Sequence, residues 1–294
     1  MKVVSTRAEL IAICGNVGGS VGVVPTMGAL HGGHLSLIRA ARHENDATIV
    51  TIFVNPTQFG PSEDFAAYPR TLDADLALLQ SEGVDVVFTP TVNELYPPGF
   101  QTQIDVAQVS QGLEGERRPG HFQGVATVVA KLFNLTRPTR AYFGQKDAQQ
   151  VVVIRRMVAD LNSRVDVVVI PTVREDDGTA MSSRNRFLSA EQRAVSPVIF
   201  RALRVAASRY TAGERHPAVL RNVIRSLVSA EPLAEIDYVS IADPRTLREL
   251  SQPVDSPLLA SVAVRFSKTR LLDNMLFPAV LNDRDGLSGT LGAV

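Results

Sequence analysis

One short segment near the N-terminus constrains the fold more than any other. An apolar run, Val21–Val24, is followed by a glycine-rich turn and then by a helical pattern that begins at Leu35. This order predicts a buried strand that leads directly into a helix N-terminus. Glycine lets the backbone approach a ligand, and a helix N-terminus favours an anion. The turn also holds His31 and His34, whose imidazoles can donate hydrogen bonds to phosphoryl oxygens. The segment therefore predicts a phosphate site at the edge of an open α/β sheet.

The pattern of strands and helices extends this prediction over about the first 170 residues. A capping box at Thr6 and Glu9 predicts a helix that ends near Gly15. Strands are then predicted at 21–24, 48–54, 85–89, 101–109, 140–143 and 165–170, and helices at 35–45, 72–82, 125–135 and 148–161. Alternation of this kind is typical of right-handed βαβ units, so we expect an α/β fold with a parallel sheet and helices on both of its faces.

The pattern changes after the sixth of these strands. A polar loop runs to residue 185. A capped helix then begins at Ser189, a second helix is predicted at 217–229, and strands are predicted at 236–241 and 259–266. We expect two domains, a catalytic domain at 1–173 and a smaller α+β domain at 174–294. The tail from about residue 280 has no periodic pattern and is expected to be disordered.

Composition excludes several classes of partner. Thirty basic residues balance thirty acidic ones, which predicts neither a nucleic acid nor an anionic membrane as partner. No apolar run approaches the ~18 residues of a membrane span. The only cysteine, Cys14, permits no intramolecular disulfide, and the N-terminus lacks the apolar core of a signal peptide. These features predict a cytoplasmic protein.

Two further polar blocks fit a phosphate site. Lys146 follows the strand predicted at 140–143, where its charge can neutralise phosphate, and Asp147 suits the start of the next helix. The alternative is a capped surface helix with a solvated lysine. Arg184 follows Ser182 and Ser183 in the polar loop, and two hydroxyls beside a guanidinium suit a mobile phosphate clamp. Taken alone, this second pattern is weak.

Other candidates leave their alternatives open. Gln58 offers a donor and an acceptor to a hydroxyl-bearing substrate, although its loop also has ordinary turn chemistry. Asp75 suits the orientation of a hydrated Mg²⁺ or simply a helix N-terminus. His31 and His34 have the spacing of a metal pair, but no third ligand is nearby. Arg118 and His121, in a polar loop predicted at 112–124, suit either an anion or a solvated loop.

Six blocks carry a close resemblance to a known family. They are PTMGALHGGH at 25–34, FVNPTQF at 53–59, YPRT at 68–71, RPGHF at 118–122, FGQKD at 143–147 and MSSRN at 181–185. In this order and spacing they resemble the pantoate–β-alanine ligase (pantothenate synthetase) family, from about Val23 to Asn274. The HxGH element alone marks the wider nucleotidylyltransferase superfamily. The blocks at 53–59, 143–147 and 181–185 are more specific.

The resemblance implies a reaction in two steps. ATP and (R)-pantoate, with Mg²⁺, give pantoyl adenylate and pyrophosphate, and β-alanine then displaces AMP to form pantothenate. It also implies a Rossmann-like N-terminal domain, a small C-terminal lid and a cytosolic homodimer. The alternatives are another nucleotidylyltransferase of the HxGH superfamily and a non-catalytic nucleotide-binding protein.

Site residues follow from the same resemblance by motif position. His34 matches the proton donor, and His31, Lys146 and Arg184 would stabilise the transition state with it. The ATP contacts implied are Met27, Gly28, Ala29, Leu30, His31, Gly32, Gly33, His34, Gly144, Gln145, Lys146, Asp147, Val173, Met181, Ser182, Ser183 and Arg184. The predicted substrate contacts are Gln58, Gln150 and Asn55, and Asp75 is the predicted metal-orienting residue. Ala148 and Ala74 depart from the pattern common in the family, where an aromatic and an acidic residue are expected, and Ala74 leaves the role of Asp75 open.

Overall fold

The computed structural model describes residues 1–60 and 65–278, which form two compact units. The first unit holds residues 1–144 and 149–170, and the second holds residues 145–148 together with the chain from Pro171. Each unit is described by itself below. The expected disorder of the tail from about residue 280 concerns residues outside the described ranges. The predicted domain boundary between residues 173 and 174 stays a prediction.

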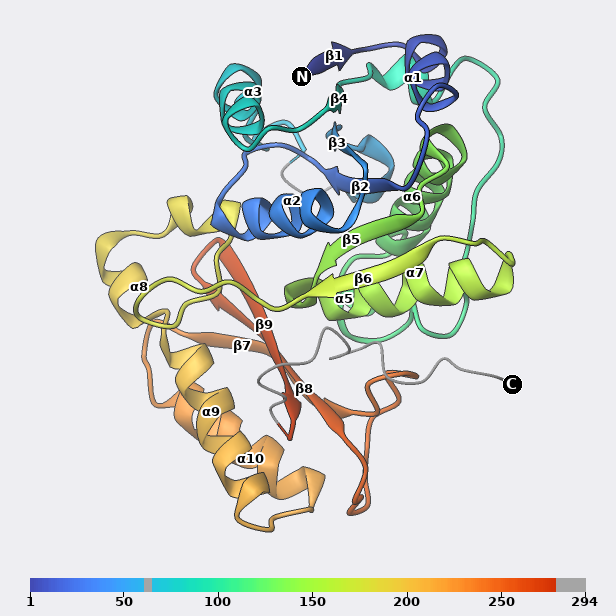
Figure 1. Cartoon of the computed structure of the whole chain (residues 1–294). Helices are drawn as coiled ribbons and strands as arrows, with labels where there is room; N and C mark the ends of the chain where they lie inside the picture. Colours follow the sequence, from blue (N-terminus) through green and yellow to red (C-terminus); the bar gives the residue numbers. More distant parts are fainter. Residues whose placement is uncertain (61–64, 279–294) are drawn as a thin grey trace. The chain divides into compact units, whose positions relative to one another are not determined.

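A six-stranded parallel sheet forms the centre of the first unit (Figure 1). Its strands are β1 (Lys2–Val4), β2 (Val21–Thr26), β3 (Ala47–Ile52), β4 (Val86–Phe88), β5 (Arg140–Gly144) and β6 (Asp166–Ile170), in the order β1-β4-β3-β2-β5-β6. Every adjacent pair is parallel, as predicted. The chain builds outward from β2 through β3 to β4 and then returns to β5. The neighbours β2 and β5 therefore mark the switch point of the sheet, outside whose carboxyl edge such folds bind their ligands.

Helices flank this sheet on both faces, which confirms the predicted α/β layers. The helices are α1 (Arg7–Cys14), α2 (Gly32–Glu44), α3 (Leu72–Ser81), α4 (Val92–Leu95), α5 (Leu113–Arg117), α6 (His121–Thr136) and α7 (Ala148–Asp160). Ile38 of α2 and Leu79 of α3 pack on Val24 and Val50 on one face. The alternate strand residues point to the other face, where α6 contacts β2. The predicted capping box of Thr6 and Glu9 opens α1.

The second unit is an α+β structure with its own core, as the change in sequence pattern predicted. Its antiparallel sheet has the order β7 (Glu235–Ala242), β8 (Leu258–Phe266) and β9 (Thr269–Phe277). Its helices are α8 (Ala190–Val195), α9 (Val198–Thr211) and α10 (Pro217–Ser229), with 3₁₀ turns η2 (Gln145–Asp147) and η3 (Ser183–Phe187). Leu203 and Ile224 from the helices pack with Val262 and Phe266 of β8 in one apolar cluster.

Some local predictions were wrong. The strand predicted at 101–109 is absent, because this segment pairs with no other strand: Ile104 N donates instead to Thr127 Oγ1 at 2.9 Å. The loop predicted at 112–124 contains α5 and the start of α6. Strands β1 and β9 were missed. The first is a three-residue edge strand, and the second carries polar Asp273 and Asn274 at positions that are buried.

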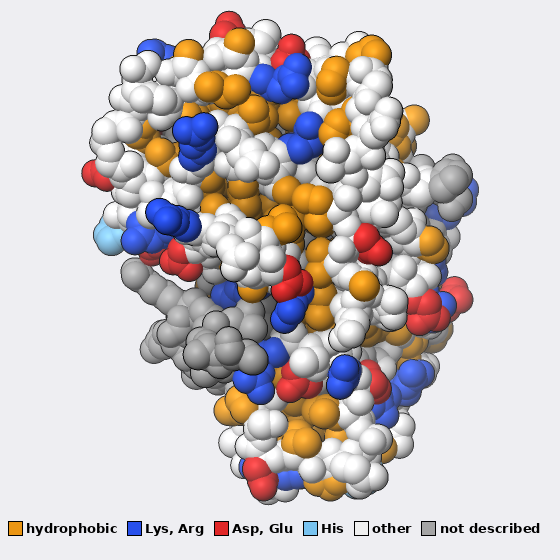
Figure 2. All heavy atoms as spheres, turned by 90° about the vertical axis from the view of Figure 1, so that its right-hand side faces the viewer, with side chains coloured by type: hydrophobic (Ala, Val, Ile, Leu, Met, Phe, Trp, Pro, Cys, Tyr) orange, Lys and Arg blue, Asp and Glu red, His pale blue; other side chains and the backbone are white. Residues whose placement is uncertain are grey.

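The surface carries mixed charge. On the face shown in Figure 2, acidic and basic side chains are interspersed, in keeping with equal numbers of each in the chain. Among the helices in the described ranges, none is long and apolar enough to span a bilayer.

Candidate functional site

The turn after β2 depends on two residues with left-handed backbone. Gly28 has φ +82° and Ala29 has φ +51°. A Cβ at Gly28 would lie 3.0 Å from the Asp75 carboxylate, so both backbone strain and lack of space favour glycine there. Thr26 Oγ1 accepts a hydrogen bond from Gly28 N at 3.2 Å. The local conformation therefore follows from glycine at the first position of the turn.

A buried carboxylate holds this turn in place. Asp75, on α3, is only 2% exposed. One of its oxygens accepts from Ala29 N at 2.9 Å, and the other accepts from Leu30 N at 2.8 Å. Thr71 Oγ1 adds a third hydrogen bond at 3.1 Å. This clamp was missed by the sequence analysis, because an acidic residue at a helix start looks the same whether it clamps a distant turn or not. The predicted contact of Asp75 with Mg²⁺ through water stays a prediction.

The two histidines cap α2 reciprocally. His31 is the N-cap residue, and its Nδ1 accepts from Gly33 N at 3.1 Å. His34 Nδ1 accepts from His31 N at 3.3 Å, and the ring centroids are 4.1 Å apart. Because each Nδ1 is an acceptor, a neutral ring carries its hydrogen on Nε2. Capping of the helix and contact with a phosphate are therefore compatible functions of one imidazole.

The structure brings together two predicted site residues from the turns after β2 and β3. Gln58, in the 3₁₀ turn η1 (Pro56–Gln58), is 8% exposed, and its Nε2 lies 3.1 Å from Met27 Sδ. Its Oε1 accepts from Asn55 Nδ2 at 3.1 Å. The side-chain amide of Gln58 is thus held from both sides.

Asn55 is a structural centre of this loop. It is 1% exposed, and its Oδ1 accepts from Thr57 Oγ1 at 2.9 Å and from Tyr96 OH at 3.0 Å. Its Nδ2 also donates to Gly124 O at 3.1 Å, in addition to Gln58. These bonds account for the burial of Asn55 and favour a supporting role. Its predicted direct contact with substrate stays a prediction.

Helix α6 contacts η1 through two residues in its first turn, His121 and Gly124. A Cβ at Gly124 would lie 2.4 Å from Thr57 O and 2.7 Å from Gln58 N, so the helix and η1 touch backbone to backbone. His121 is 7% exposed, and its Nδ1 lies 2.9 Å from Gln58 O. A carbonyl oxygen only accepts, so Nδ1 donates here and Nε2 accepts from Arg118 Nη1 at 3.1 Å. The alternative of a solvated loop is wrong for His121.

Gln150, a predicted pantoate contact, is the third residue of α7 and is partly buried. Its neighbour Gln149 has a role that the sequence did not reveal. Gln149 Nε2 lies within hydrogen-bonding distance of Val109 O and of two further carbonyls, and its Oε1 accepts from Glu114 N at 2.9 Å. Gln149 thereby fixes the segment that leads into α5.

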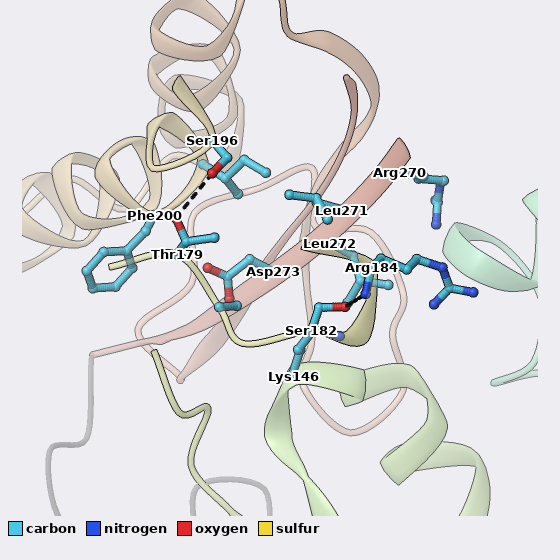
Figure 3. A pocket seen from close by; sticks show the side chains of 12 residues that line it. Lys146, Thr179, Ser182, Arg184, Ser196, Phe200, Arg270, Leu271, Leu272 and Asp273 are labelled. Atoms are coloured by element: carbon cyan, nitrogen blue, oxygen red, sulfur yellow. Dashed lines mark hydrogen bonds between the residues drawn. The ribbon is translucent and has the colours of Figure 1, made fainter. Parts of the chain in front are cut away.

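The second unit contains a hollow that is lined by three predicted ATP contacts (Figure 3). Lys146, Ser182 and Arg184 line it, together with Thr179, Arg270 and Asp273. Lys146 belongs to η2, whereas Ser182 and Arg184 belong to the loop around η3. Two cationic side chains and a hydroxyl from separate segments therefore line one hollow, and their role as a phosphate clamp stays a prediction.

The loop around η3 is ordered by its own hydrogen bonds. Ser182 is the N-cap residue of η3, and its Oγ accepts from Arg184 N at 3.2 Å. Met181 N donates to Val173 O at 2.9 Å, so two more predicted ATP contacts are paired through the backbone. Ser183 is the first residue of η3. These bonds give the loop a defined conformation in the structure, and its expected movement as a clamp stays a prediction.

Asp273, which lines the hollow, belongs to a buried ion pair that could not be predicted from the sequence. Asp273 of β9 is 3% exposed and accepts two hydrogen bonds from the Arg174 guanidinium, at 2.6 and 3.1 Å. Burial raises the pKa of the Asp273 carboxyl, and the hydrogen bonds from Arg174 act against that rise. The guanidinium also stacks 3.9 Å above the Phe200 ring. The two residues are 99 positions apart, so local pattern gives no sign of the pair.

Comparisons with known proteins agree with these motifs. A family model described as pantoate-beta-alanine ligase matches residues 2–276. The chain is 59% identical to the pantothenate synthetase of Roseiflexus castenholzii over 279 residues, which is 95% of this chain and 100% of that protein. It is 60% identical to the pantothenate synthetase of Chloroflexus aurantiacus over 256 residues, 87% of this chain and 91% of that one.

Solved structures give the same result. The crystal structure of pantothenate synthetase from Thermus thermophilus matches with a TM-score of 0.89 and 49% identity, covering 94% of this chain and 99% of that one. The pantoate-beta-alanine ligase of Francisella tularensis, solved in complex with beta-gamma ATP and β-alanine, matches with a TM-score of 0.76 and 35% identity, covering 94% of this chain and 97% of that one.

Proposed function

The chain belongs to the pantoate–β-alanine ligase family, which joins pantoate to β-alanine with the consumption of ATP, and we propose that it does so through a pantoyl adenylate. In the first step the carboxylate of (R)-pantoate attacks the α-phosphorus of ATP and pyrophosphate leaves. In the second step the amine of β-alanine attacks the acyl carbon, AMP leaves, and the amine loses a proton. The observation that carries this proposal is the hollow that gathers Lys146, Ser182 and Arg184.

Charge is the obstacle in the first step. The carboxylate of pantoate is already ionised at neutral pH, so it needs no strong base, but it must approach a polyphosphate. The cations of Lys146 and Arg184 offset that repulsion and stabilise the charge on the phosphoryl oxygens. Ser182 and Ser183 add hydroxyl donors from the same loop. This arrangement favours adenylation over a simple binding function.

The turn after β2, in the first unit, carries further proposed ATP contacts. His34 is the residue proposed to act on the reacting phosphate, with His31 as its partner, and each would donate a hydrogen bond to a phosphoryl oxygen through the Nε2 hydrogen of its neutral ring. The remaining contacts proposed from the motifs, from Met27 to Gly33 and at Gly144, Gln145, Asp147, Val173 and Met181, supply backbone and side-chain donors around the nucleotide.

Gln58 is the proposed pantoate contact, with Gln150 beside it in this role. The side-chain amide of Gln58 is buried and held by Asn55 and Met27, which suits orientation of a small polar acid. Replacement Gln58→Ala should raise the KM for pantoate and leave the KM for ATP within about twofold of the wild-type value. An unchanged pantoate KM contradicts the contact.

Mg²⁺ is the proposed metal, delivered with ATP. Mg²⁺ in nucleotide sites is bound mainly by substrate phosphates and retained waters, and protein carboxylates contribute one or two contacts. Asp75 fits such a role only through water, because both of its oxygens accept amide hydrogens at 2.8 and 2.9 Å. When bound, the ion would neutralise phosphate charge. Mg²⁺-dependent activity with an unchanged Mg²⁺ requirement in Asp75→Asn would remove Asp75 from this proposal.

The proposed assembly is a homodimer in the cytoplasm. The family resemblance supports both points, and the single cysteine, which permits no intramolecular disulfide, supports the second. Light scattering on the purified protein should give twice the chain mass of 31.8 kDa.

One experiment tests the two-step route. With ATP and pantoate but no β-alanine, the enzyme should catalyse exchange of labelled pyrophosphate into ATP and should retain pantoyl adenylate. Addition of β-alanine should then release AMP. Absence of pantoate-dependent exchange, together with AMP release only when all three substrates are present, would contradict a free-standing adenylate.

A further inference from the structure

The turn that carries Lys146 is anchored by a single side chain of β9. Asn274 Nδ2 donates to Gln145 O at 2.9 Å and to Lys146 O at 2.8 Å. Asn274 is 3% exposed and lies 128 residues beyond Lys146 in the chain. Both hydrogens of one amide therefore hold two successive carbonyls of η2, and all three residues belong to the second unit.

The chemistry of this anchor is specific to an amide. Two carbonyl oxygens that converge on one point require two donors on one atom, which the NH₂ group of asparagine provides. An aspartate of the same shape has no such donors, and a leucine has no polar atom. Within the described chain no group donates to Asn274 Oδ1, which is buried. Asparagine at this position is thus used for its donors alone, although an unsatisfied buried acceptor is unfavourable.

Further contacts leave the turn little freedom. Ala148, directly after η2, packs with Leu259 and Leu276 of the same sheet. Asp273 Oδ1 accepts from the Asn274 backbone N–H at 2.8 Å, and Asp273 is itself held by Arg174. The Lys146 side chain, 20% exposed, lines the hollow with Asp273. The Arg174–Asp273 ion pair therefore holds the backbone of Asn274, and the side chain of Asn274 in turn holds the backbone of Lys146.

We propose that Asn274 is a positioning residue for the ligase reaction, which holds the backbone of Gln145 and Lys146 so that the lysine ammonium is presented to the hollow. The inference rests on the proposed role of Lys146 in adenylation. Asn274 contacts no substrate in this proposal and acts only through the lysine. A displacement of about 1 Å of such a group costs about a hundredfold in rate.

Two variants test the anchor, Asn274→Leu and Asn274→Asp, each close in size to asparagine. Both should lower kcat for pantoate-dependent pyrophosphate exchange by about tenfold to a hundredfold. Amination of chemically supplied pantoyl adenylate should stay within about twofold, because Lys146 is assigned to the first step. Equal losses in both half-reactions, or full exchange activity in both variants, overturn the proposal.

A control separates positioning from stability. Ile224→Val trims a fully buried side chain of α10 in the same unit and should lower the melting temperature by about 2–4 °C. Exchange activity of this variant should remain at the wild-type level. A loss in Ile224→Val similar to that in Asn274→Leu at equal melting temperature shows a merely structural effect and overturns the proposal.

A double variant and an activity-free measurement complete the test. Asn274→Leu combined with Lys146→Ala should be no slower in exchange than Lys146→Ala alone, because the anchor acts through the lysine. Additive losses contradict that dependence. Amide hydrogen exchange in a peptide covering residues 144–149 should accelerate in Asn274→Leu and not in Ile224→Val. If wild-type enzyme shows no pyrophosphate exchange, the adenylate route fails, while the peptide measurement still decides whether Asn274 holds the turn.

Discussion

Two turns follow neighbouring strands at the switch point of the sheet, and they are held in opposite ways. The turn after β2 is held through its amide hydrogens, which Asp75 accepts at Ala29 and Leu30. The turn after β5 is held through its carbonyl oxygens, to which Asn274 donates. One anchor is an acceptor and the other a donor, so exchanging Asp for Asn, or Asn for Asp, at either position removes a required group.

The difference in location has a functional consequence. Asp75 lies 45 residues from Leu30 in the turn that it holds and in the same compact unit, so the first unit alone sets the conformation of the β2 turn. Asn274 belongs to the second unit, and so do the four residues that follow β5. The position of Lys146 therefore depends on the folding of the second unit, although β5 itself belongs to the first.

The largest effect is expected from Lys146→Ala, which removes the charge that the second turn presents. Loss of one preorganised electrostatic contact typically lowers the rate by about 10²–10³. Pyrophosphate exchange should fall by that factor, whereas amination of supplied pantoyl adenylate should continue at a useful rate. Lys268→Ala, which removes an exposed lysine of the same unit that does not line the hollow, serves as the matched control. Equal loss in both half-reactions with Lys146→Ala would refute the division of roles between the steps.

Asp75→Asn should release the first turn. The amide keeps one acceptor oxygen but places an NH₂ group where the other oxygen accepted a backbone hydrogen, so one buried amide loses its charged partner. We expect a loss of about 2–3 kcal/mol in the free energy of unfolding, measured in urea, and weaker ATP binding. Asp73→Asn, on the same helix but exposed, should change neither quantity. Equal losses in the two variants would show that only the charge near the helix N-terminus matters.

Asp75 also shows that local sequence signals predict the elements of the site but not the long-range contacts that hold them. The order of β2, turn and α2 was predictable because residues 21–44 carry their own signals: an apolar run, glycines and a helical period. The capping boxes at Thr6 and Ser189 were predictable for the same reason, because their partners are three residues apart. The family blocks led to the hollow at Lys146 and Arg184, but the reason that Lys146 is held there lies 128 residues away.

The contacts that sequence reasoning missed share one property. Those made by Asp75, by Asn274 and between Arg174 and Asp273 act across 45 to 129 positions of the chain. In the sequence each of these residues looks like an ordinary polar residue at a helix start, in a strand or in a loop. Residues 101–109 were wrongly predicted as a strand for a related reason. Their local pattern does not show whether a neighbouring strand is present to pair with them.

Gly124→Ala tests the contact between α6 and η1, which depends neither on Asp75 nor on Asn274. The new methyl group would meet the backbone of Thr57 and Gln58 at 2.4–2.7 Å, so η1 or α6 must move. Overpacking of this kind typically costs about 1–3 kcal/mol, and the shift should raise the KM for pantoate more than that for ATP. Gly18→Ala is the control, because nothing lies within 4 Å of the Cβ it would add. A pantoate KM that stays constant would separate η1 from substrate binding.

The smallest effect is expected from Thr71→Val, which removes one of three donors to Asp75 and leaves the turn's two amide bonds intact. The loss in unfolding free energy should be about 1 kcal/mol, with ATP binding unchanged. Comparing Thr71→Val with Asp75→Asn separates two contributions. One is the stability that the protein gains from the Thr71–Asp75 hydrogen bond, and the other is the conformation of the turn that Asp75 holds. If Thr71→Val weakens ATP binding as much as Asp75→Asn, the hydroxyl also orients the carboxylate. In that case two side chains, those of Thr71 and Asp75, together set the conformation of the first turn.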